Sequence, residues 1–314
     1  MSGALPTRER RGPGAAAVGL PADLERGGAL ACTIGEYAKT ALQVARACMP
    51  GGHYLDLAAD PTATSRLRDL HEEAATAGST LVTGAGFGVL ATEAVVVTLC
   101  ANRPVPSHVR VDALSSMATE AGVMGAAFAA SIIDVLTTGG LRYEDGRLAK
   151  TRLGADVQHL TLPDGQKVKS AGAPSGELIA AQRASGAPNV TITSALAPPA
   201  RPYERSFRSP GSCSPSQHCA ASPSASWPAS VSRRPPVPGS NPGDTPSSPG
   251  RTAPAEKDGY AWLRADDGMD YTAGAAAETA ARLARGEGKP GAHTPAAALG
   301  PDLTTATGGT FILR

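Results

Sequence analysis

The sequence predicts an α/β protein in which a parallel, doubly wound sheet is followed by an α+β domain with a mixed sheet. Between residues 36 and 101, helical and strand patterns alternate with short connections, which is typical of parallel strands. After about residue 105, short strands joined by Gly-containing turns indicate antiparallel hairpins. A long Ser/Pro-rich segment interrupts this second pattern.

Helices and strands alternate in the parallel half of the sequence. In order, we expect a helix over 36–48, a strand over 53–57, a helix over 64–78, a strand over 79–83 and a helix over 89–101. Ala41, Ala45 and Cys48 share one face of the first helix, which Pro50 and the glycines after it terminate. Gly78 supplies the stop after the second helix.

The mixed half contains hairpins and helices. The expected elements are a strand over 108–115, a helix over 118–140, hairpins turning at Glu144–Gly146 and Pro163–Gly165, a helix over 175–186 and a strand over 189–196, followed after the insert by a strand over 258–268 and a helix over 271–286. Ser175 and Asp270 are the expected N-caps of the last two helices.

The domain boundaries follow the changes in composition. We expect a flexible leader over 1–27, a partial parallel-sheet domain over 28–104, an α+β substrate or dimerisation domain over 105–202, a disordered segment over 203–257 and a C-terminal strand and helix over 258–314. About half of the residues between Ser206 and Pro254 are Ser or Pro, and no apolar period remains to offset the entropy of ordering.

The overall composition excludes several classes of protein. Aromatic residues are only 4% of the chain, so the core is expected to consist mainly of Ala, Val and Leu. With a net charge of +1, the chain has no excess of basic residues that would indicate nucleic-acid binding. Five cysteines without a CxxC pair indicate neither a metal site nor a disulfide framework. The weakly polar run 122–133 is too short to span a membrane, so we expect a cytoplasmic protein.

The glycine cluster at 84–88 admits two interpretations. Starting at Gly84, the dinucleotide pattern G-x-G-x-x-G has Val89 at its third glycine position; starting at Gly86, it reaches Ala91, a permitted variant. Asp112 would then be the candidate ribose-binding acid. However, two helix–strand units precede the cluster, whereas the fingerprint normally follows the first strand. The sequence therefore favours a structural or substrate-facing turn over a pyrophosphate site.

Tyr54 and Asp56 are candidate ligand-binding residues at the end of a predicted strand. Because side chains alternate along a strand, they share one face, whereas His53 lies on the other and forms no acid–base pair with Asp56. At the carboxyl end of a parallel strand they would face the crevice where open sheets bind ligands. The alternative is a structural, hydrogen-bonded Asp56. His71 is expected to be exposed, and His293 to lie in a loop.

Several segments resemble the saccharopine dehydrogenase-like oxidoreductases, which include the bacterial trans-acting enoyl reductase type. These segments are 34–60, 67–88, 139–148, 175–190 and 259–301. The resemblance extends over 28–202 and 258–312. It implies a Rossmann domain that binds NADP or NAD, here a partial Rossmann-like sheet, followed by a domain that dimerises and shapes the pocket for a small-molecule substrate.

The resemblance also assigns candidate site residues. Gly35, Glu36 and Tyr37 occupy the place of the family's Gly-Pro-aromatic turn near the nicotinamide, and are the candidate cofactor-binding residues. Tyr54 and Asp56 match a G-x-H-Y-x-D strand, and Gly86 with Phe87 match a G-x-G-F loop; these four are the candidate substrate-binding residues. Glu36 replaces the family's proline, and Ala58-Ala59-Asp60 replaces its Thr/Ser-Gly-Glu.

The family's glycine fingerprint lies on a first strand well before the turn that Gly35 matches, and residues 1–34 do not contain it. On this comparison the chain is an N-terminally truncated member. We expect an impaired NAD(P)-dependent oxidoreductase that transfers hydride to or from a C=N or C=C bond. The alternative is a catalytically inactive dimerisation scaffold.

Overall fold

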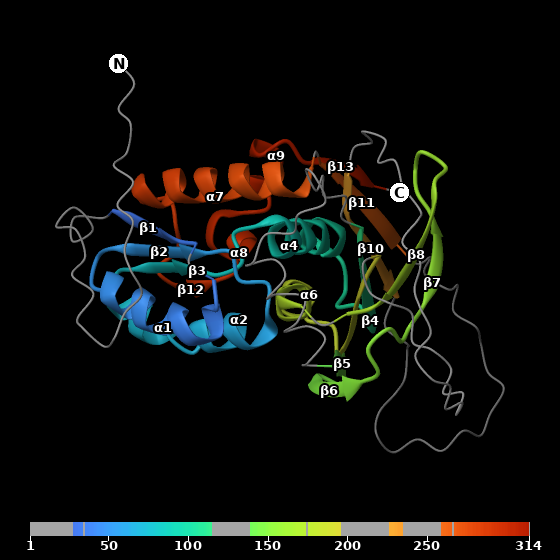
Figure 1. The fold of residues 1–314 in the computed structure, drawn as a ribbon, viewed down its shortest axis with the longest axis horizontal. Helices are drawn as coiled ribbons and strands as arrows, with labels where there is room; N and C mark the ends of the chain where they lie inside the picture. The colour runs from blue at the N-terminus through green and yellow to red at the C-terminus, as the bar shows by residue number, and fades with distance from the viewer. Residues whose placement is uncertain are drawn as a thin grey trace, which may run out of the picture.

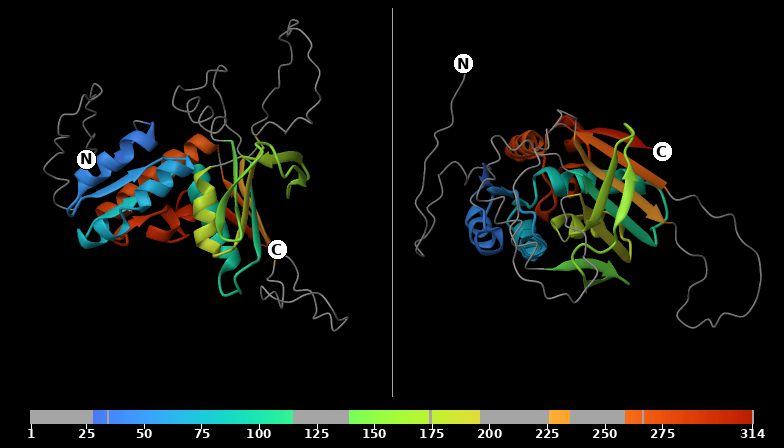
Figure 2. Two further views of the ribbon diagram at one scale, coloured as in Figure 1. Left: turned by 90° about the horizontal axis from the view of Figure 1, so that it is seen from below. Right: turned by 45° about the vertical axis from the view of Figure 1, so that its right-hand side comes forward.

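The fold consists of two sheets with helices packed around and between them (Figures 1 and 2). The computed structural model describes residues 28–33, 35–114, 139–173, 175–195, 226–234, 259–265 and 267–313, with the backbone alone for 226–234. One sheet is parallel and the other is mixed but mainly antiparallel. The predicted α/β class, with a parallel sheet and a mixed-sheet region, is confirmed.

The parallel sheet has four strands in the order β1-β2-β3-β12. Their bounds are Ala29–Cys32 for β1, His53–Asp56 for β2, Thr80–Val82 for β3 and Gly291–His293 for β12. The predicted strands β2 and β3 form its centre. The outer strands β1 and β12 were not predicted, because Ala, Gly and His are weak strand formers whose conformation depends on their neighbours.

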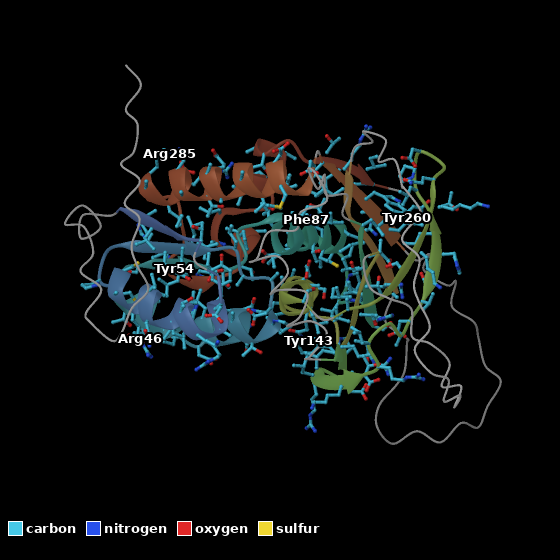
Figure 3. All side chains as sticks on the ribbon, viewed as in Figure 1. Arg46, Tyr54, Phe87, Tyr143, Tyr260 and Arg285 are labelled. Carbon is cyan, nitrogen blue, oxygen red and sulfur yellow. The ribbon has the colours of Figure 1, made fainter. Side chains whose placement is uncertain are left out.

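Helices cover both faces of this sheet. Helices α1 (Tyr37–Cys48), α2 (Pro61–Arg68) and α3 (His71–Thr76) lie on one side, and α7 (Gly268–Ala284) lies on the other (Figure 1). Tyr54 points from β2 toward α1 and α2 (Figure 3), into a cluster with Leu67 and Leu81. Leu55, the next residue, packs with Val82 and Leu283 on the α7 side.

The single helix predicted over 64–78 is two helices. The first begins earlier, at Pro61, because the Asp60 side chain caps it by accepting a hydrogen bond from the Ala63 amide (2.7 Å). It ends in tighter turns, since the amides of Asp69 and Leu70 bond to carbonyls three residues back. As expected, Gly78 follows α3 in a left-handed conformation (φ 65°).

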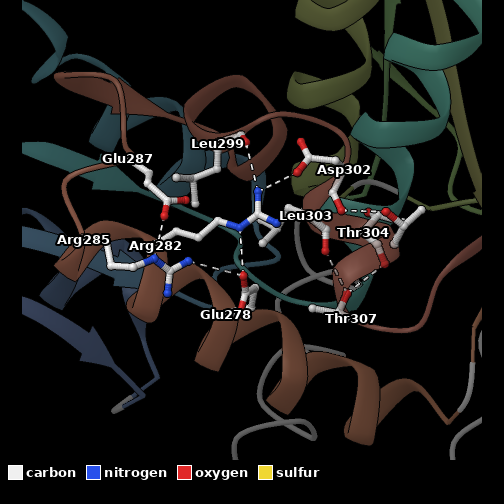
Figure 4. A network of polar contacts seen from close by, with 10 residues as sticks. Glu278, Arg282, Arg285, Glu287, Leu299, Asp302, Leu303, Thr304 and Thr307 are labelled. Atoms are coloured by element: carbon white, nitrogen blue, oxygen red, sulfur yellow. Dashed lines mark hydrogen bonds and ion pairs between the residues drawn. The ribbon is translucent and has the colours of Figure 1, made fainter.

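Helix α7 is held at both ends by polar side chains. Its N-cap is Asp267, which accepts from the Met269 amide (2.8 Å), rather than the predicted Asp270, which lies in the first turn. Near the other end, Arg282 binds Glu278 (2.9 Å) and Asp302 (2.7 Å; Figure 4). These contacts fix α7 to the chain that follows β12.

Within the ranges that the structure describes, the mixed sheet has nine strands. They are β4 (His108–Leu114), β5 (Gly140–Glu144), β6 (Arg147–Thr151), β7 (Gln158–Thr161), β8 (Lys167–Gly172), β9 (Asn189–Ser194), β10 (Ser226–Arg234), β11 (Gly259–Ala265) and β13 (Thr310–Leu313). The main order is β13-β11-β10-β4-β9-β5-β6, and β8 joins β7 to β9. Both predicted hairpins are confirmed; Asp145 and Gly146 have the positive φ (49° and 77°) of a type I′ turn.

Strand β10 lies within the segment predicted to be disordered. It pairs with β4 on one side and with β11 on the other, with Val231 opposite both Val111 and Ala261. The prediction of disorder over 203–257 therefore does not hold for 226–234, where backbone pairing replaces the missing apolar pattern. Leader residues 1–27, the rest of 203–257 and most of the helix expected over 118–140 lie outside the described residues.

The main core surrounds α4 (Phe87–Cys100), which packs against the mixed sheet and against α6 (Gly176–Ser185), α7 and two short helices, α8 (Pro295–Leu299) and α9 (Leu303–Ala306). Its buried members are mostly Ala, Val, Leu and Ile, with Tyr271 as the only buried aromatic in this cluster among the described residues. Within the same described part of the chain, no helix is both long and apolar enough to cross a bilayer.

Candidate functional site

The candidate site lies at the carboxyl edge of the parallel sheet, where open α/β sheets bind ligands. Turns that follow β1, β2 and β3 leave this edge and lead into α1, α2 and α4. The residues predicted from the sequence lie on these turns, at the end of β2, or at the first positions of α1 and α4. The topology therefore brings the two predicted sets, Gly35–Tyr37 and Gly86–Phe87, to the same edge as Asp56.

Asp56 is fully buried and makes four hydrogen bonds at the end of β2. Its Oδ1 accepts from the amides of Ala58 (2.9 Å) and Gly84 (3.0 Å) and from the hydroxyl of Thr83 (3.0 Å). Its Oδ2 accepts from the Tyr54 hydroxyl (3.0 Å). Burial raises the pKa of the Asp56 carboxyl, and these hydrogen bonds oppose that increase. These contacts fit the alternative in which Asp56 has a structural role, because its carboxylate holds the turns after β2 and β3 together.

The charge of this carboxylate acts on two tyrosines, Tyr54 and Tyr37. Tyr54 is fully buried, and burial followed by the charge of Asp56 strongly raises the pKa of its phenol. Tyr37 is half-buried at the start of α1, and the same two causes raise its pKa to about 12. Both phenols are therefore protonated at neutral pH and can donate hydrogen bonds, but neither can act as a base.

The turn before α1 is open. Gly35 and Glu36 both have left-handed backbone conformations (φ 81° and 45°), and Glu36 is the N-cap residue of α1. A Cβ at Gly35 would meet no atom of the described residues within 4 Å, so this backbone faces space that they leave unfilled. The exposed Glu36 side chain binds Lys39 (2.9 Å) rather than pointing across the edge of the sheet.

By contrast, the protein's own atoms fill the turn before α4. The amides of Gly84 and Ala85 bond to the side chain and the carbonyl of Asp56 (3.0 and 2.7 Å), and the Phe87 amide bonds to the Thr272 hydroxyl on α7 (3.1 Å). A Cβ at Gly84 would come within 2.8 Å of Val89. A pyrophosphate needs free amides and open space at such a turn. The turn therefore does not fit a pyrophosphate, in agreement with the interpretation that the sequence favours.

Glu177, which the sequence analysis did not select, lies against this turn. It is 7% exposed, and a Cβ at Gly88 would overlap its carboxylate. Its Oε2 has no hydrogen-bond partner among the described residues, nor does the Ser175 hydroxyl, so Ser175 occupies the predicted N-cap position without capping. Burial raises the pKa of Glu177 to about 7. A glutamate in the first turn of a helix is usually exposed to solvent. The only feature of the sequence that indicates the burial of Glu177 is the apolar character of the residues around it.

A second buried glutamate has a structural role. Glu93, in the middle of α4, accepts from the Ala296 amide (2.8 Å) and from the Thr294 hydroxyl. It therefore holds the start of α8, which follows β12, against α4. Burial raises its pKa to about 7 despite these hydrogen bonds.

None of the histidines in the described ranges forms an acid–base pair with Asp56. His53 is buried and its Nδ1 accepts from the Thr80 amide (3.0 Å), as expected for a side chain on the other face of β2. His71 and His293 are each partly buried and contact one another edge-to-face, with ring centroids 4.9 Å apart. The exposure expected for His71 and the loop expected for His293 are both wrong, because β12 brings them together.

No family model and no curated protein matches the chain. Among solved structures, it is similar to apo saccharopine dehydrogenase (L-Glu forming) from Saccharomyces cerevisiae, at 14% identity and a TM-score of 0.33; 53% of this chain and 39% of that one are covered. It is also similar to the candidate oxidoreductase yvaA from Bacillus subtilis, at 12% identity and a TM-score of 0.27, over 89% and 77% of the two chains. The match thus spans about two fifths of the yeast enzyme, and the likeness in both cases is distant.

Proposed function

We propose that the chain is a nicotinamide-dependent oxidoreductase of the saccharopine dehydrogenase-like kind, using NADP or NAD and acting on a C=N or C=C bond of a small molecule. The observation that supports this proposal is the convergence of three turns at the carboxyl edge of the parallel sheet, with space before the backbone of Gly35 that the described residues leave open. The segments that resemble the family include all three of these turns.

In this proposal, Gly35 and Tyr37 would hold the nicotinamide, and Gly86 and Phe87 would contact the substrate. The nicotinamide would supply or accept the hydride. Tyr37, whose phenol is protonated at neutral pH, would orient a bound group by donating a hydrogen bond. Because Gly84–Phe87 leaves no space for a pyrophosphate, that turn has no part in holding the cofactor.

Titration of the full chain with NADPH and NADH, followed by nucleotide fluorescence, tests the proposal. Gly35→Ala places a methyl group where the ring would lie, and should weaken binding at least about tenfold. Gly78→Ala is a matched control, because Gly78 also has a positive φ (65°) and open space, but precedes β3 at the opposite edge of the sheet. Equal affinities of the two variants, or no binding to the unmodified chain, would contradict the proposal.

A catalytically inactive dimerisation scaffold is the second candidate. The filled glycine turn favours it, because that turn offers no phosphate-binding amides. In this case, neither nucleotide would bind at millimolar concentration, while sedimentation equilibrium would give the mass of a dimer. A monomer that binds NADPH would exclude the scaffold.

A further inference from the structure

We propose that Arg68, Arg183 and Tyr143 form a binding site for an oxyanion, the phosphate or carboxylate group of a small molecule, at the contact between α2, α6 and β5. This site is separate from the glycine turn and does not depend on the proposed redox activity.

The packing of α2 on α6 places the two arginines at one contact. Near the start of α6, a Cβ at Gly176 would lie 2.8 Å from the Thr64 hydroxyl on α2. Arg68 follows Thr64 by four positions and Arg183 follows Gly176 by seven, so each arginine lies on the face of its helix that meets the other helix. Both side chains therefore extend from the same helix–helix interface.

Tyr143 reaches this contact from the mixed sheet. It lies on β5 opposite Val190 of β9, and it packs half-buried against the main core (Figure 3). Burial raises the pKa of its phenol, while the charges of Arg68 and Arg183 both act to lower it. Because β5 packs against α6 and the charges of both arginines act on this phenol, we assign Tyr143 to the same cluster as the two arginines.

The charge of this arginine pair is not balanced within the described residues, where neither side chain forms a hydrogen bond or an ion pair within 4 Å. Burial and the charge of Arg183 lower the pKa of Arg68 to about 10. Two carboxyl groups act on Arg68 at longer range: Glu93, already bonded to Thr294 and Ala296, and the exposed Asp69. Two adjacent guanidinium groups with unused planar donors are suited to an oxyanion.

Isothermal titration of the full chain, in a chloride buffer without other oxyanions, tests the site with two probes, inorganic phosphate and succinate. We expect one anion to bind per chain. Arg183→Ala should weaken that binding by about tenfold or more, since it removes a charge-assisted contact. Arg103→Ala, which removes an exposed arginine that follows α4, is the control and should leave the affinity unchanged.

A second measurement separates ligand binding from a structural role of the arginine. Without an anion, Arg183→Ala should not lower the unfolding midpoint, because it relieves repulsion with Arg68, whereas added phosphate should no longer raise the midpoint. Tighter binding of phosphate identifies a phosphoryl ligand, and tighter binding of succinate a carboxylate; either result supports the site. No binding by the unmodified chain, or equal affinities of the two variants, would overturn it.

Discussion

The Oδ1 atom of Asp56 lies 3.0 Å from the backbone nitrogen of Gly84, which joins the end of β2 to the turn that begins α4. The same oxygen also accepts from Ala58 in the turn after β2 and from Thr83 at the end of β3. A single buried carboxylate thus fixes the relative positions of two of the turns that form the candidate site.

Asp56→Ala should therefore lower the free energy of unfolding by roughly 3 kcal/mol or more, because buried donors lose their acceptor. Equilibrium urea unfolding followed by circular dichroism measures the effect. Asp69→Ala, at the exposed end of α2, is the control and should change stability by less than about 0.5 kcal/mol. Similar losses in both variants would show that the Asp56 hydrogen bonds do not stabilise the fold.

Gly84→Ala should destabilise the protein more than Gly286→Ala. Both glycines have similar positive φ values (79° and 72°), so both substitutions introduce backbone strain of roughly 1–2 kcal/mol. Only at Gly84 would the new methyl group also collide with Val89, whereas Gly286 faces open space. Urea midpoints of the two variants should therefore differ, and equal midpoints would contradict the close packing of this turn.

Stability should fall as pH rises from about 5 to 8. Burial raises the pKa of Glu93 and of Glu177 from 4.5 to about 7, so in this range the native state retains protons that the unfolded chain has released. Each group contributes on the order of 3 kcal/mol to the decrease. Urea unfolding at several pH values gives the slope of the free energy of unfolding against pH. This slope should be smaller in Glu177→Gln than in the unmodified chain. It should be unchanged in Glu72→Gln, which alters an exposed residue. An unaltered slope in Glu177→Gln would contradict the assignment.

Arg282→Met should destabilise the attachment of α7. The Arg282 side chain is 13% exposed and binds both Glu278 and Asp302, so its loss removes a largely buried cation that joins α7 to the segment after α8. We expect a loss of about 1–2 kcal/mol in urea unfolding. Arg285→Met, which removes a 53% exposed side chain from the same helix, should have a much smaller effect. The reverse order of the two losses would contradict the role of Arg282.

The sequence predicts those elements whose signals are local. The helix over 37–48 has a regular apolar face and a Pro-Gly stop, and the hairpin at Asp145–Gly146 has the residues that its turn requires. The strands at 29–32 and 291–293 lack such signals, because partners distant in sequence determine their conformation. Strand β10, rich in Ser and Pro, is an extreme case of the same dependence on pairing.

For the site as well, positions set by the local sequence could be predicted, whereas contacts between distant segments could not. The place of Asp56 at the end of a parallel strand follows from the alternation of residues around it. Its partner Gly84 could not be predicted, since that contact requires β3 to lie beside β2. The contact of Glu177 with Gly88 depends on the packing of α6 on α4, which no local pattern encodes.

Strand β12 pairs with β3 through Ala292 and Leu81, although these residues are far apart in the sequence. During synthesis, β3 therefore remains an unprotected edge until residues near 293 have left the ribosome. Contacts between such distant segments form slowly, because a long loop must close first. The parallel sheet therefore gains its fourth strand only after residues 291–293 have been translated, long after β3 itself.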